Sequence, residues 1–487
     1  MALAPFFDRI YGAVGMHLSV SRKSLSDSLG ATVVGVSCGA ELSPNERTIA
    51  EMAVNLTARL YPTLAILGEH DDVESLKRLA AAINPAVDFA DEAPGETSIC
   101  VGAITASGAI YPAASGWVAR LGHELPLGGG IENPYAATAA AALACSELFR
   151  RIFLHSVPEQ DLSLSLLDFG STAGMDMFLS SESIGDVLFV GVGAVGNAAL
   201  WALARDIRTS GSLFLIDHET ITLSNLQRYA LANYSDVSKP KVDVAYEAMQ
   251  KTAFKISTHR STLEDFKLSG LQCPTTCISV DNVNGRRVAQ ALLPKLVING
   301  WTGDRALGAS WHRFSSNVAC LACLYHPHGQ GLSAIQQAAQ ALGLPEQRAA
   351  TLWLTRAPLS EDERKVAAKK LGVKMGALSP WRNKPLADLY TDVICGAVPI
   401  DLAGTDHVEV VPLAHQSVLA GVLMAAELLK RNQPALAAIS QAEPLVAWDD
   451  VLKAPPKIWS KPRPREIGCI CGDPVYQAVY AGKWHID

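Results

Sequence analysis

A glycine-rich turn between a short apolar run and a helical pattern is the feature that most restricts the fold of this chain. The apolar run spans residues 187–190, Gly191, Gly193 and Gly196 follow it, and a helical pattern continues over residues 197–205. Backbone N–H groups of such a turn, and the positive end of its helix, meet the phosphate oxygens of a nucleotide. The sequence therefore predicts a doubly wound α/β domain that binds a nucleotide.

A carboxylate at the end of the next apolar run fits the same ligand. Asp217 follows the run 213–216. It lies about 20 residues after the last glycine, where a carboxylate commonly holds a ribose hydroxyl. Up to this point the pattern is equally typical of a nicotinamide dehydrogenase.

The polar and cationic residues that follow argue against hydride transfer. Asn225, Arg228 and Lys241 come just past the second predicted strand. Two fixed cations suit a nucleotide whose phosphate is attacked, because they stabilise the charge that develops there. A solvated charged loop is the alternative interpretation of Arg228 and Lys241.

A second carboxylate follows another apolar run. Residues 277–280 lead into Asp281 and Asn282, at the carboxyl end of a predicted strand, where open α/β sheets bind ligands. We predict that Asp281 binds magnesium, that Asn282 lies in the nucleotide site, and that Arg286 is a further phosphate contact. A helix cap is the alternative role of Asp281 or Asn282.

The order of these motifs, GxGxxG, LxD, SNLQR, PK and DN, resembles the adenylation domain shared by ubiquitin-activating enzymes and the bacterial ThiF and MoeB proteins. The resemblance implies that ATP and Mg²⁺ bind here. A protein's C-terminal carboxylate is already a nucleophile at neutral pH, so the chemistry needs charge stabilisation at the α-phosphate and no general base. The roles carried over by resemblance fall on Gly191, Gly193, Gly196, Asp217, Asn225, Arg228, Lys241 and Asp281.

The N-terminal part reads as a second copy of this architecture without its ATP chemistry. Residues 31–36 and 64–67 have strand patterns, and residues 44–60 and 72–83 have helical patterns. No GxGxxG spacing and no SNLQR counterpart accompany them. This pairing of an inactive and an active half resembles the plan of ubiquitin-activating enzymes.

We therefore expect two Rossmann-like ThiF-type domains in one pseudo-dimeric chain. The predicted boundaries are 1–168 for the inactive domain, 169–185 for a linker, and 186–487 for the active domain with a helical insert at 324–394. Near the start, residues 8–12 resemble the arginine-bearing helix with which the family's inactive half reaches its partner's ATP site. Arg9 is thus a candidate triphosphate contact, and a surface arginine is the alternative.

Two cysteine pairs point to a metal site. The chain has ten cysteines, and without an export signal they favour metal ligation and thiol chemistry over a disulfide framework. Cys320 and Cys323 resemble the family's zinc knuckle, whereas Cys469 and Cys471 depart from it because their spacing is CxC. Four thiolates can enclose a structural zinc. Unrelated reduced thiols are the alternative.

One further cysteine is a candidate nucleophile. Cys395 precedes the apolar helical stretch 412–430, which resembles the family's last core helix. In family members that form a thioester, the acceptor cysteine can occupy this position, so we predict that its thiolate attacks the acyl-adenylate. A small buried core cysteine is the alternative. The insert before it shows helical patterns at 332–342, 346–355 and 361–371, and we expect it to move the cysteine or contact a partner.

Net charge and sequence patterns argue against several other classes of protein. The formal net charge of −7 supplies no broad basic surface, so nucleic-acid binding is not expected. The start lacks a signal-peptide pattern, and the apolar stretch 99–119 contains Gly, Ser, Thr and Pro that favour strand and turn over a membrane span. We expect a cytoplasmic protein.

These observations lead to one functional hypothesis. We predict an enzyme that adenylates the C-terminal glycine of a ubiquitin-like protein, forms a thioester on Cys395 and passes it to a conjugating enzyme. The plan resembles bacterial ubiquitin-like conjugation systems of the BilD type. Three alternatives stay open: activation of a sulfur-carrier protein for thiamine or molybdopterin synthesis, a non-catalytic scaffold that binds a ubiquitin-like protein, and a dehydrogenase.

Overall fold

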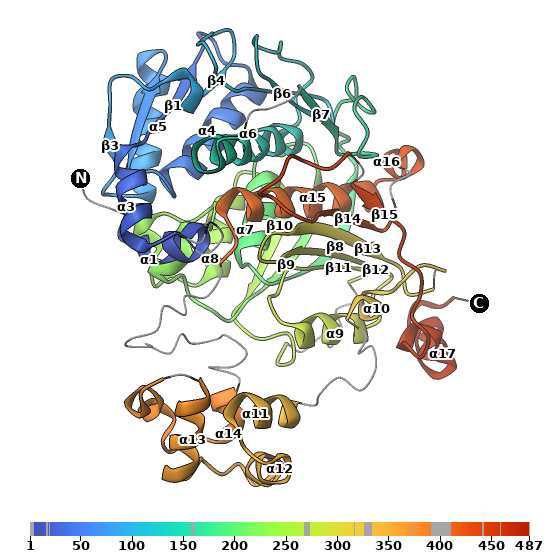
Figure 1. Cartoon of the computed structure of the whole chain (residues 1–487). Helices are drawn as coiled ribbons and strands as arrows, with labels where there is room; N and C mark the ends of the chain where they lie inside the picture. Colours follow the sequence, from blue (N-terminus) through green and yellow to red (C-terminus); the bar gives the residue numbers. More distant parts are fainter. Residues whose placement is uncertain are drawn as a thin grey trace. The chain divides into compact units, whose positions relative to one another are not determined.

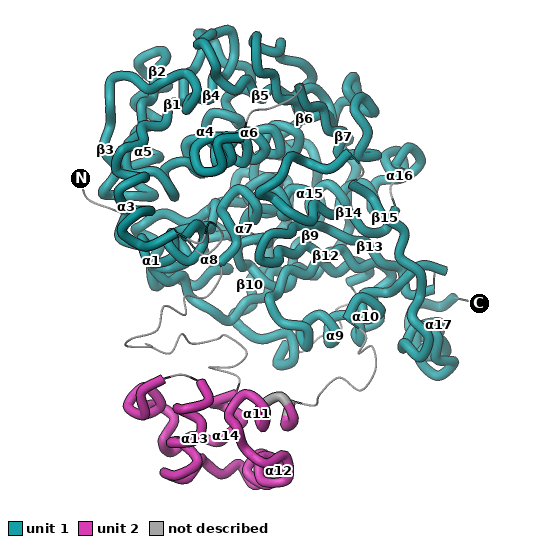
Figure 2. Tube along the Cα trace, in the orientation of Figure 1, with its two compact units in different colours: residues 1–326, 411–487 teal, residues 327–410 magenta. Residues whose placement is uncertain are grey.

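The chain contains two compact units (Figure 2). Unit 1 comprises residues 1–326 and 411–487, and unit 2 comprises residues 327–410. The predicted boundary between 1–168 and 186–487 falls inside unit 1 and stays a prediction. The computed structural model describes residues 4–15, 18, 20–156, 161–266, 273–315, 317–325, 334–371, 373–390, 411–440, 443–457 and 459–486.

The N-terminal half of unit 1 contains a parallel sheet with the order β3-β2-β1-β4 (Figure 1). Strand β1 is buried along almost its whole length, as is usual when helices cover both faces of a parallel sheet. A three-stranded antiparallel sheet follows. The strands are β1 (Val33–Cys38), β2 (Thr63–Leu67), β3 (Asp88–Phe89), β4 (Ser98–Val101), β5 (Tyr111–Ser115), β6 (Val118–Gly122) and β7 (Leu162–Ser165).

Helices connect and cover these strands. Helix α4 begins with a capping box in which Ser43 and Glu46 satisfy each other's backbone N–H groups, and Pro44 occupies the first turn. The helices of this half are α1 (Phe7–Ile10), α3 (Arg22–Ala31), α4 (Pro44–Ala58), α5 (His70–Ile83) and α6 (Pro134–Leu154), with a π-helical turn at Tyr11–Gly15.

The C-terminal half of unit 1 contains an eight-stranded sheet with the order β10-β9-β8-β11-β12-β13-β14-β15. The first five strands are parallel, and the last three pair antiparallel. The strands are β8 (Ser183–Val190), β9 (Ser210–Ile216), β10 (Ala253–His259), β11 (Thr275–Ile278), β12 (Leu296–Thr302), β13 (Leu307–His312), β14 (Leu445–Trp448) and β15 (Ser460–Lys461). Counted within each half, the parallel strands follow the order 3-2-1-4 in the first sheet and 3-2-1-4-5 in the second, which confirms the predicted α/β class with two Rossmann-like sheets.

The helices of this half include the one that the glycine turn opens. Helix α7 follows β8 directly, as the strand, turn and helix pattern predicted. The described helices are α7 (Ala194–Leu203), α8 (Lys241–Met249), α9 (Val283–Ala291), α10 (Leu321–Leu324), α15 (Ala414–Asn432), α16 (Pro434–Ile439) and α17 (Pro474–Trp484). In the described part of the chain, no helix combines the length and apolar character needed to cross a membrane.

The two halves of unit 1 share a core built from four helices. Helix α4 packs on α6 as α7 packs on α15, and α6 and α15 lie side by side (Figure 1). Residues 134–150 of α6 and 414–430 of α15 are buried, and a helix buried on every side lies inside a protein. The halves are therefore joined through a continuous interior.

A buried ion pair fixes α15 to the segment after β7. The side chains of Lys430 and Glu427 are both fully buried, with 2.5 Å between Nζ and Oε1. Lys430 Nζ also donates to the carbonyls of Leu166, at 2.7 Å, and Leu167, at 3.2 Å. Burial lowers the pKa of Lys430, and Glu427 opposes this shift.

Lys430→Met is expected to lower the free energy of unfolding by about 3 kcal/mol, because removal of one partner leaves a buried carboxylate poorly compensated. Lys461→Met is the matched control. Its side chain is 41% exposed and pairs with the 72% exposed Asp449, so a change below about 1 kcal/mol is expected. Urea unfolding of both variants measures the difference, and equal small losses would show that the buried pair adds little.

Unit 2 is a helical bundle with its own core. Its described helices are α11 (Ala334–Leu342), α12 (Glu346–Leu354), α13 (Glu361–Leu371) and α14 (Leu386–Leu389), with a 3₁₀ turn at Met375–Trp381. Leu342, Leu352, Leu378 and Leu386 are at the centre of its apolar cluster. The three helical patterns predicted in this insert are observed at nearly the same bounds. Cys395 lies outside the described residues.

Candidate active site

The glycine turn packs closely against the end of β11. Gly191 has φ +88°, and a Cβ there would lie 3.1 Å from the carbonyl carbon of Ser279. At Gly196 a Cβ would lie 2.2 Å from the carbonyl oxygen of Gly191 and 2.5 Å from Ser279 Oγ. The Ser279 hydroxyl donates to that same carbonyl at 2.7 Å. Both positions therefore require glycine, and Gly193 caps α7 between them.

Gly196→Ala is expected to weaken ATP binding about tenfold or more, since the added methyl must displace the turn. Calorimetric titration with ATP measures the affinity. Gly482→Ala is the control, because nothing lies within 4 Å of a Cβ at that position. Wild-type affinity in Gly196→Ala would contradict the role of the turn.

Asp217 links the glycine turn to the chain after β9. Its Oδ2 accepts a hydrogen bond from the Val192 N–H at 2.8 Å, and its Oδ1 accepts one from the Glu219 N–H at 2.9 Å. A carboxylate has about four acceptor positions, so two bonds leave room for a ligand hydroxyl. The ribose role of Asp217 stays a prediction.

Lys241 is a buried cation at the start of α8. Its side chain is 5% exposed, and its ammonium pairs with the Glu219 carboxylate and lies 5.2 Å from the centre of the Tyr229 ring. Burial alone lowers the pKa of Lys241, but Tyr229, Asp217 and Glu219 outweigh it and raise this pKa. Lys241 is thus held in its charged form beside the glycine turn.

Asn225 and Arg228 lie in and after the 3₁₀ turn η3 (Leu223–Gln227). The Asn225 Oδ1 accepts from the Thr222 N–H at 2.9 Å, so this oxygen shapes the turn, and its amide nitrogen is the group suited to a phosphate. The Arg228 guanidinium carbon lies 6.0 Å from the centre of the Tyr229 ring. Tyr229 therefore contacts both predicted cations.

The N-terminal half reaches this turn by two routes. Helix α1, which contains Arg9, packs against η3, and the triphosphate contact of Arg9 stays a prediction. From α4 and the residue after it, Asn55 and Arg59 donate hydrogen bonds to backbone carbonyls of residues 226–232. Sequence reasoning did not single out Asn55 or Arg59, because only the packing of the two halves brings α4 to this turn.

Asn282 caps α9, which was the alternative role proposed for it. Its Oδ1 accepts from the Gly285 N–H at 2.6 Å, and its Nδ2 donates to Asp281 Oδ1 at 3.3 Å. Asp281 is exposed at the carboxyl end of β11. An exposed carboxylate at this edge fits the oxygen ligands that Mg²⁺ prefers, so the magnesium role of Asp281 stays a prediction.

Arg286 faces the protein interior in this structure. Its guanidinium donates to Asn299 Oδ1 and to the carbonyls of Gly300, at 3.3 Å, and Val280, at 2.5 Å. Burial lowers the pKa of Arg286. These contacts hold the chain after β11, and the phosphate contact predicted for Arg286 remains untested.

A buried polar chain continues from this arginine toward the cysteines. Asn299 Nδ2 donates to Ser310 Oγ at 3.0 Å, and His312 contacts Ser310 Oγ at 2.9 Å and the Ala319 carbonyl at 2.8 Å. Burial lowers the pKa of His312 to about 4, so the neutral ring has one donor and one acceptor and satisfies both neighbours. No sequence motif marked these residues, because they meet only across β12 and β13.

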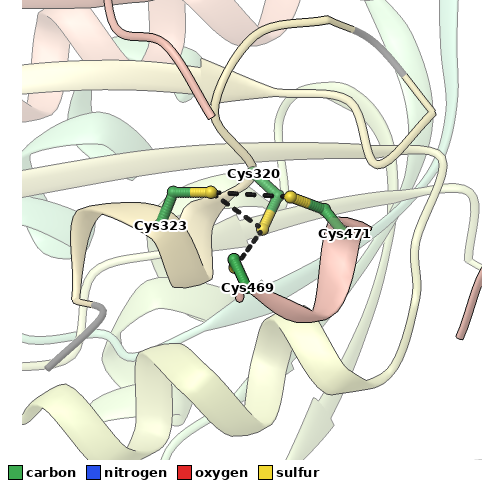
Figure 3. Close-up of side chains that lie close together, drawn as sticks. All are labelled: Cys320, Cys323, Cys469 and Cys471. Carbon is green, nitrogen blue, oxygen red and sulfur yellow. Dashed lines mark hydrogen bonds between the residues drawn. The ribbon is translucent and has the colours of Figure 1, made fainter. Parts of the chain in front are cut away.

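The four cysteines of the two predicted pairs form one buried cluster (Figure 3). Their sulfur atoms all lie within 4.8 Å of one another. The closest pairs are 3.8 Å for Cys320 and Cys323, 3.6 Å for Cys320 and Cys469, and 3.5 Å for Cys323 and Cys471. A tetrahedral zinc with bonds of about 2.3 Å places its sulfurs about 3.8 Å apart. The CxC spacing is therefore compatible with a four-thiolate metal site.

The cluster joins the C-terminal tail to the sheet. Tyr480 and Trp484 of α17 pack with Phe314 around the cysteines. The Glu466 N–H donates to Cys323 Sγ at 3.4 Å, as backbone groups do around metal thiolates. The described cysteines are all free, so no disulfide contributes here.

Two protein families match parts of this chain. The ThiF family matches residues 171–273, and Prokaryotic E2 family C matches residues 37–154. The uncharacterized protein y4jF of Sinorhizobium fredii is 30% identical over 512 residues, which cover 99% of this chain and 98% of that protein. The molybdopterin-synthase adenylyltransferase of Escherichia coli is 37% identical over 98 residues, which cover 19% of this chain and 39% of the enzyme.

The crystal structure of E. coli MccB is 18% identical, with 59% of this chain and 65% of that chain covered and a TM-score of 0.35. The glycine turn and the SNLQR turn lie in residues 171–273, whose match to the ThiF family supports an enzyme of the adenylating class. The chain belongs to the ThiF–MoeB superfamily.

Proposed function

We propose that this enzyme activates the C-terminal glycine of a ubiquitin-like protein with ATP and passes the activated glycine to a conjugating enzyme. The observation that carries the proposal is the convergence of four elements at the carboxyl ends of β8 and β9. These are the glycine turn, Asp217, the turn with Asn225 and Arg228, and Lys241. All of them lie within the region that matches the ThiF family.

The first step is adenylation. A carboxylate oxygen of the glycine attacks the α-phosphorus of ATP, the bond to the β-phosphate oxygen breaks, and pyrophosphate leaves. Arg228 and Lys241 stabilise the added charge in the transition state. Asp281 would hold Mg²⁺, which supplies further charge neutralisation at the phosphates when bound.

The second step is thioester formation on Cys395. The thiolate attacks the carbonyl carbon of the acyl-adenylate, the bond to the phosphate oxygen breaks, and AMP leaves with the electron pair. Support comes from the position of Cys395, upstream of α15 and after the helices of unit 2. The match of residues 37–154 to a prokaryotic E2 family supports the link to a conjugating enzyme.

A structural zinc in the cysteine cluster is part of the same proposal. We expect about one equivalent of zinc per purified chain, and we expect Cys469→Ser to lose it and to unfold at a lower temperature. Cys273→Ser is the control, because Cys273 is buried outside the cluster. Less than about half an equivalent in the wild type, without loss on purification, would contradict a zinc site.

A second candidate function ends at sulfur transfer. The E. coli molybdopterin-synthase adenylyltransferase that resembles this chain favours it. In that case the enzyme adenylates a sulfur-carrier protein. It forms no thioester and passes nothing to a conjugating enzyme.

One incubation distinguishes the two functions. The enzyme, ATP, Mg²⁺ and a small ubiquitin-like protein that ends in glycine are mixed, and products are separated with and without reductant. A reductant-sensitive enzyme adduct that moves to a conjugating enzyme supports conjugation. An adenylate without any such adduct supports the sulfur-carrier function, and the absence of both products contradicts the proposal.

A further inference from the structure

Arg59 is a buried arginine whose partners lie mostly in the other half of unit 1. It follows α4 and is 1% exposed. Its Nη1 donates to the Leu226 carbonyl, its Nη2 donates to the Ala232 carbonyl at 2.9 Å, and its Nε donates to Asn55 Oδ1 at 2.9 Å. Asn55 in turn donates from Nδ2 to the Ala230 carbonyl at 2.9 Å. Together they hold three carbonyls that bracket Arg228.

The same segment is fixed from its own half. The Leu231 N–H donates to Oδ1 of Asn197 at 2.7 Å, and Asn197 is fully buried on α7. Because α7 begins in the glycine turn, this bond sets the distance between that turn and residues 226–232. The segment is thus held between α7 on one side and α4 on the other.

This use of an arginine is costly for the fold. Arg59 donates its hydrogen bonds to carbonyl and amide oxygens, which are neutral, and burial lowers the pKa of Arg59 to about 9. A buried charge destabilises a protein unless its hydrogen bonds are made. A guanidinium holds its N–H donors in a rigid planar fork. Arg59 can therefore fix the carbonyls of Leu226 and Ala232 relative to each other, although they are six residues apart in the sequence.

We infer that Asn55 and Arg59 are positioning residues of the nucleotide site, which the N-terminal half supplies. They hold the backbone of residues 226–232 so that Arg228 is in place before ATP binds, an inference that rests on the proposed function. Preorganised charge needs no rearrangement during the reaction. The N-terminal half therefore contributes positioning residues to the nucleotide site, although it is itself an inactive copy of the fold.

Hydrogen exchange tests the inference without any catalysis. In Arg59→Met, backbone amides of residues 226–232 are expected to exchange faster than in the wild type, while those of β8 and α7 keep their protection. Asn55→Leu removes one of the bonds and serves if the first variant folds poorly. Arg47→Met is the control, because Arg47 lies on α4, the helix that precedes Arg59, and makes an exposed pair with Asp72. Unchanged exchange at residues 226–232 in both variants would overturn the inference.

Kinetics then separate positioning from general stability. Arg59→Met is expected to lower kcat for ATP–pyrophosphate exchange about tenfold with a smaller change in KM, and Arg59→Lys, which keeps the charge without the fork, is expected to share that loss. In an Arg228→Ala background, Arg59→Met should have no further effect on kcat. Additive losses, or full activity in Arg59→Lys, would overturn the inference. If the wild type shows no exchange at all, the proposed function fails, and hydrogen exchange still decides the role of Arg59.

Discussion

Arg228→Ala is expected to slow ATP–pyrophosphate exchange by about 10²–10³-fold, because it removes a fixed charge aimed at the phosphate under attack. The structure places Arg228 directly after η3 and next to Tyr229, which also contacts the buried Lys241. The loss should appear in kcat more than in KM, since the charge acts mainly in the transition state.

The control for this prediction is Arg260→Ala. Arg260 is 61% exposed and pairs with Asp243 on the surface of the same half, so its replacement is expected to leave exchange unchanged. Equal rates for Arg228→Ala and the wild type would remove Arg228 from the site. Equal losses in both variants would indicate a general effect of charge.

Cys395→Ala is expected to abolish the reductant-sensitive adduct while ATP–pyrophosphate exchange continues at nearly the wild-type rate. The reason is chemical, because exchange needs only the adenylation site, whereas a thioester needs a sulfur nucleophile. Gel electrophoresis of the adduct with and without reductant, and radiolabelled pyrophosphate exchange, measure the two steps separately.

Cys100→Ala is the matched control for the adduct. Cys100 is buried in β4, and burial raises the pKa of its thiol, so it is a poor nucleophile. Its replacement should leave both steps intact. An adduct that persists in Cys395→Ala would assign the nucleophile to another residue, and loss of exchange in that variant would give Cys395 a structural role.

The local parts of the fold could be predicted from the sequence. The turn needs residues without a Cβ at Gly191 and Gly196. The spacing of these glycines in the sequence is therefore enough to predict the turn. The apolar runs before it and before Asp217 became neighbouring parallel strands. The helical patterns of the insert also became helices, because their periodicity reports their buried faces.

The long-range contacts could not be predicted in this way. The hydrogen bonds of Arg286 to Asn299 and to two carbonyls had no motif, because only the packing of β11 beside β12 brings these groups together. Asn55 and Arg59 have no motif, and their partners lie more than 160 residues away. The meeting of the two cysteine pairs is an exception, because the sequence predicted one four-cysteine site and the structure brings all four sulfur atoms together.

Adenylation of a protein's terminal carboxylate is tested by ATP–pyrophosphate exchange with a small ubiquitin-like protein that ends in glycine, used intact and without its last glycine. We expect rapid exchange with the intact protein and none with the shortened form, since only the intact protein presents the carboxylate of its last glycine. Exchange at the same rate with both forms, or with neither form, would contradict this expectation.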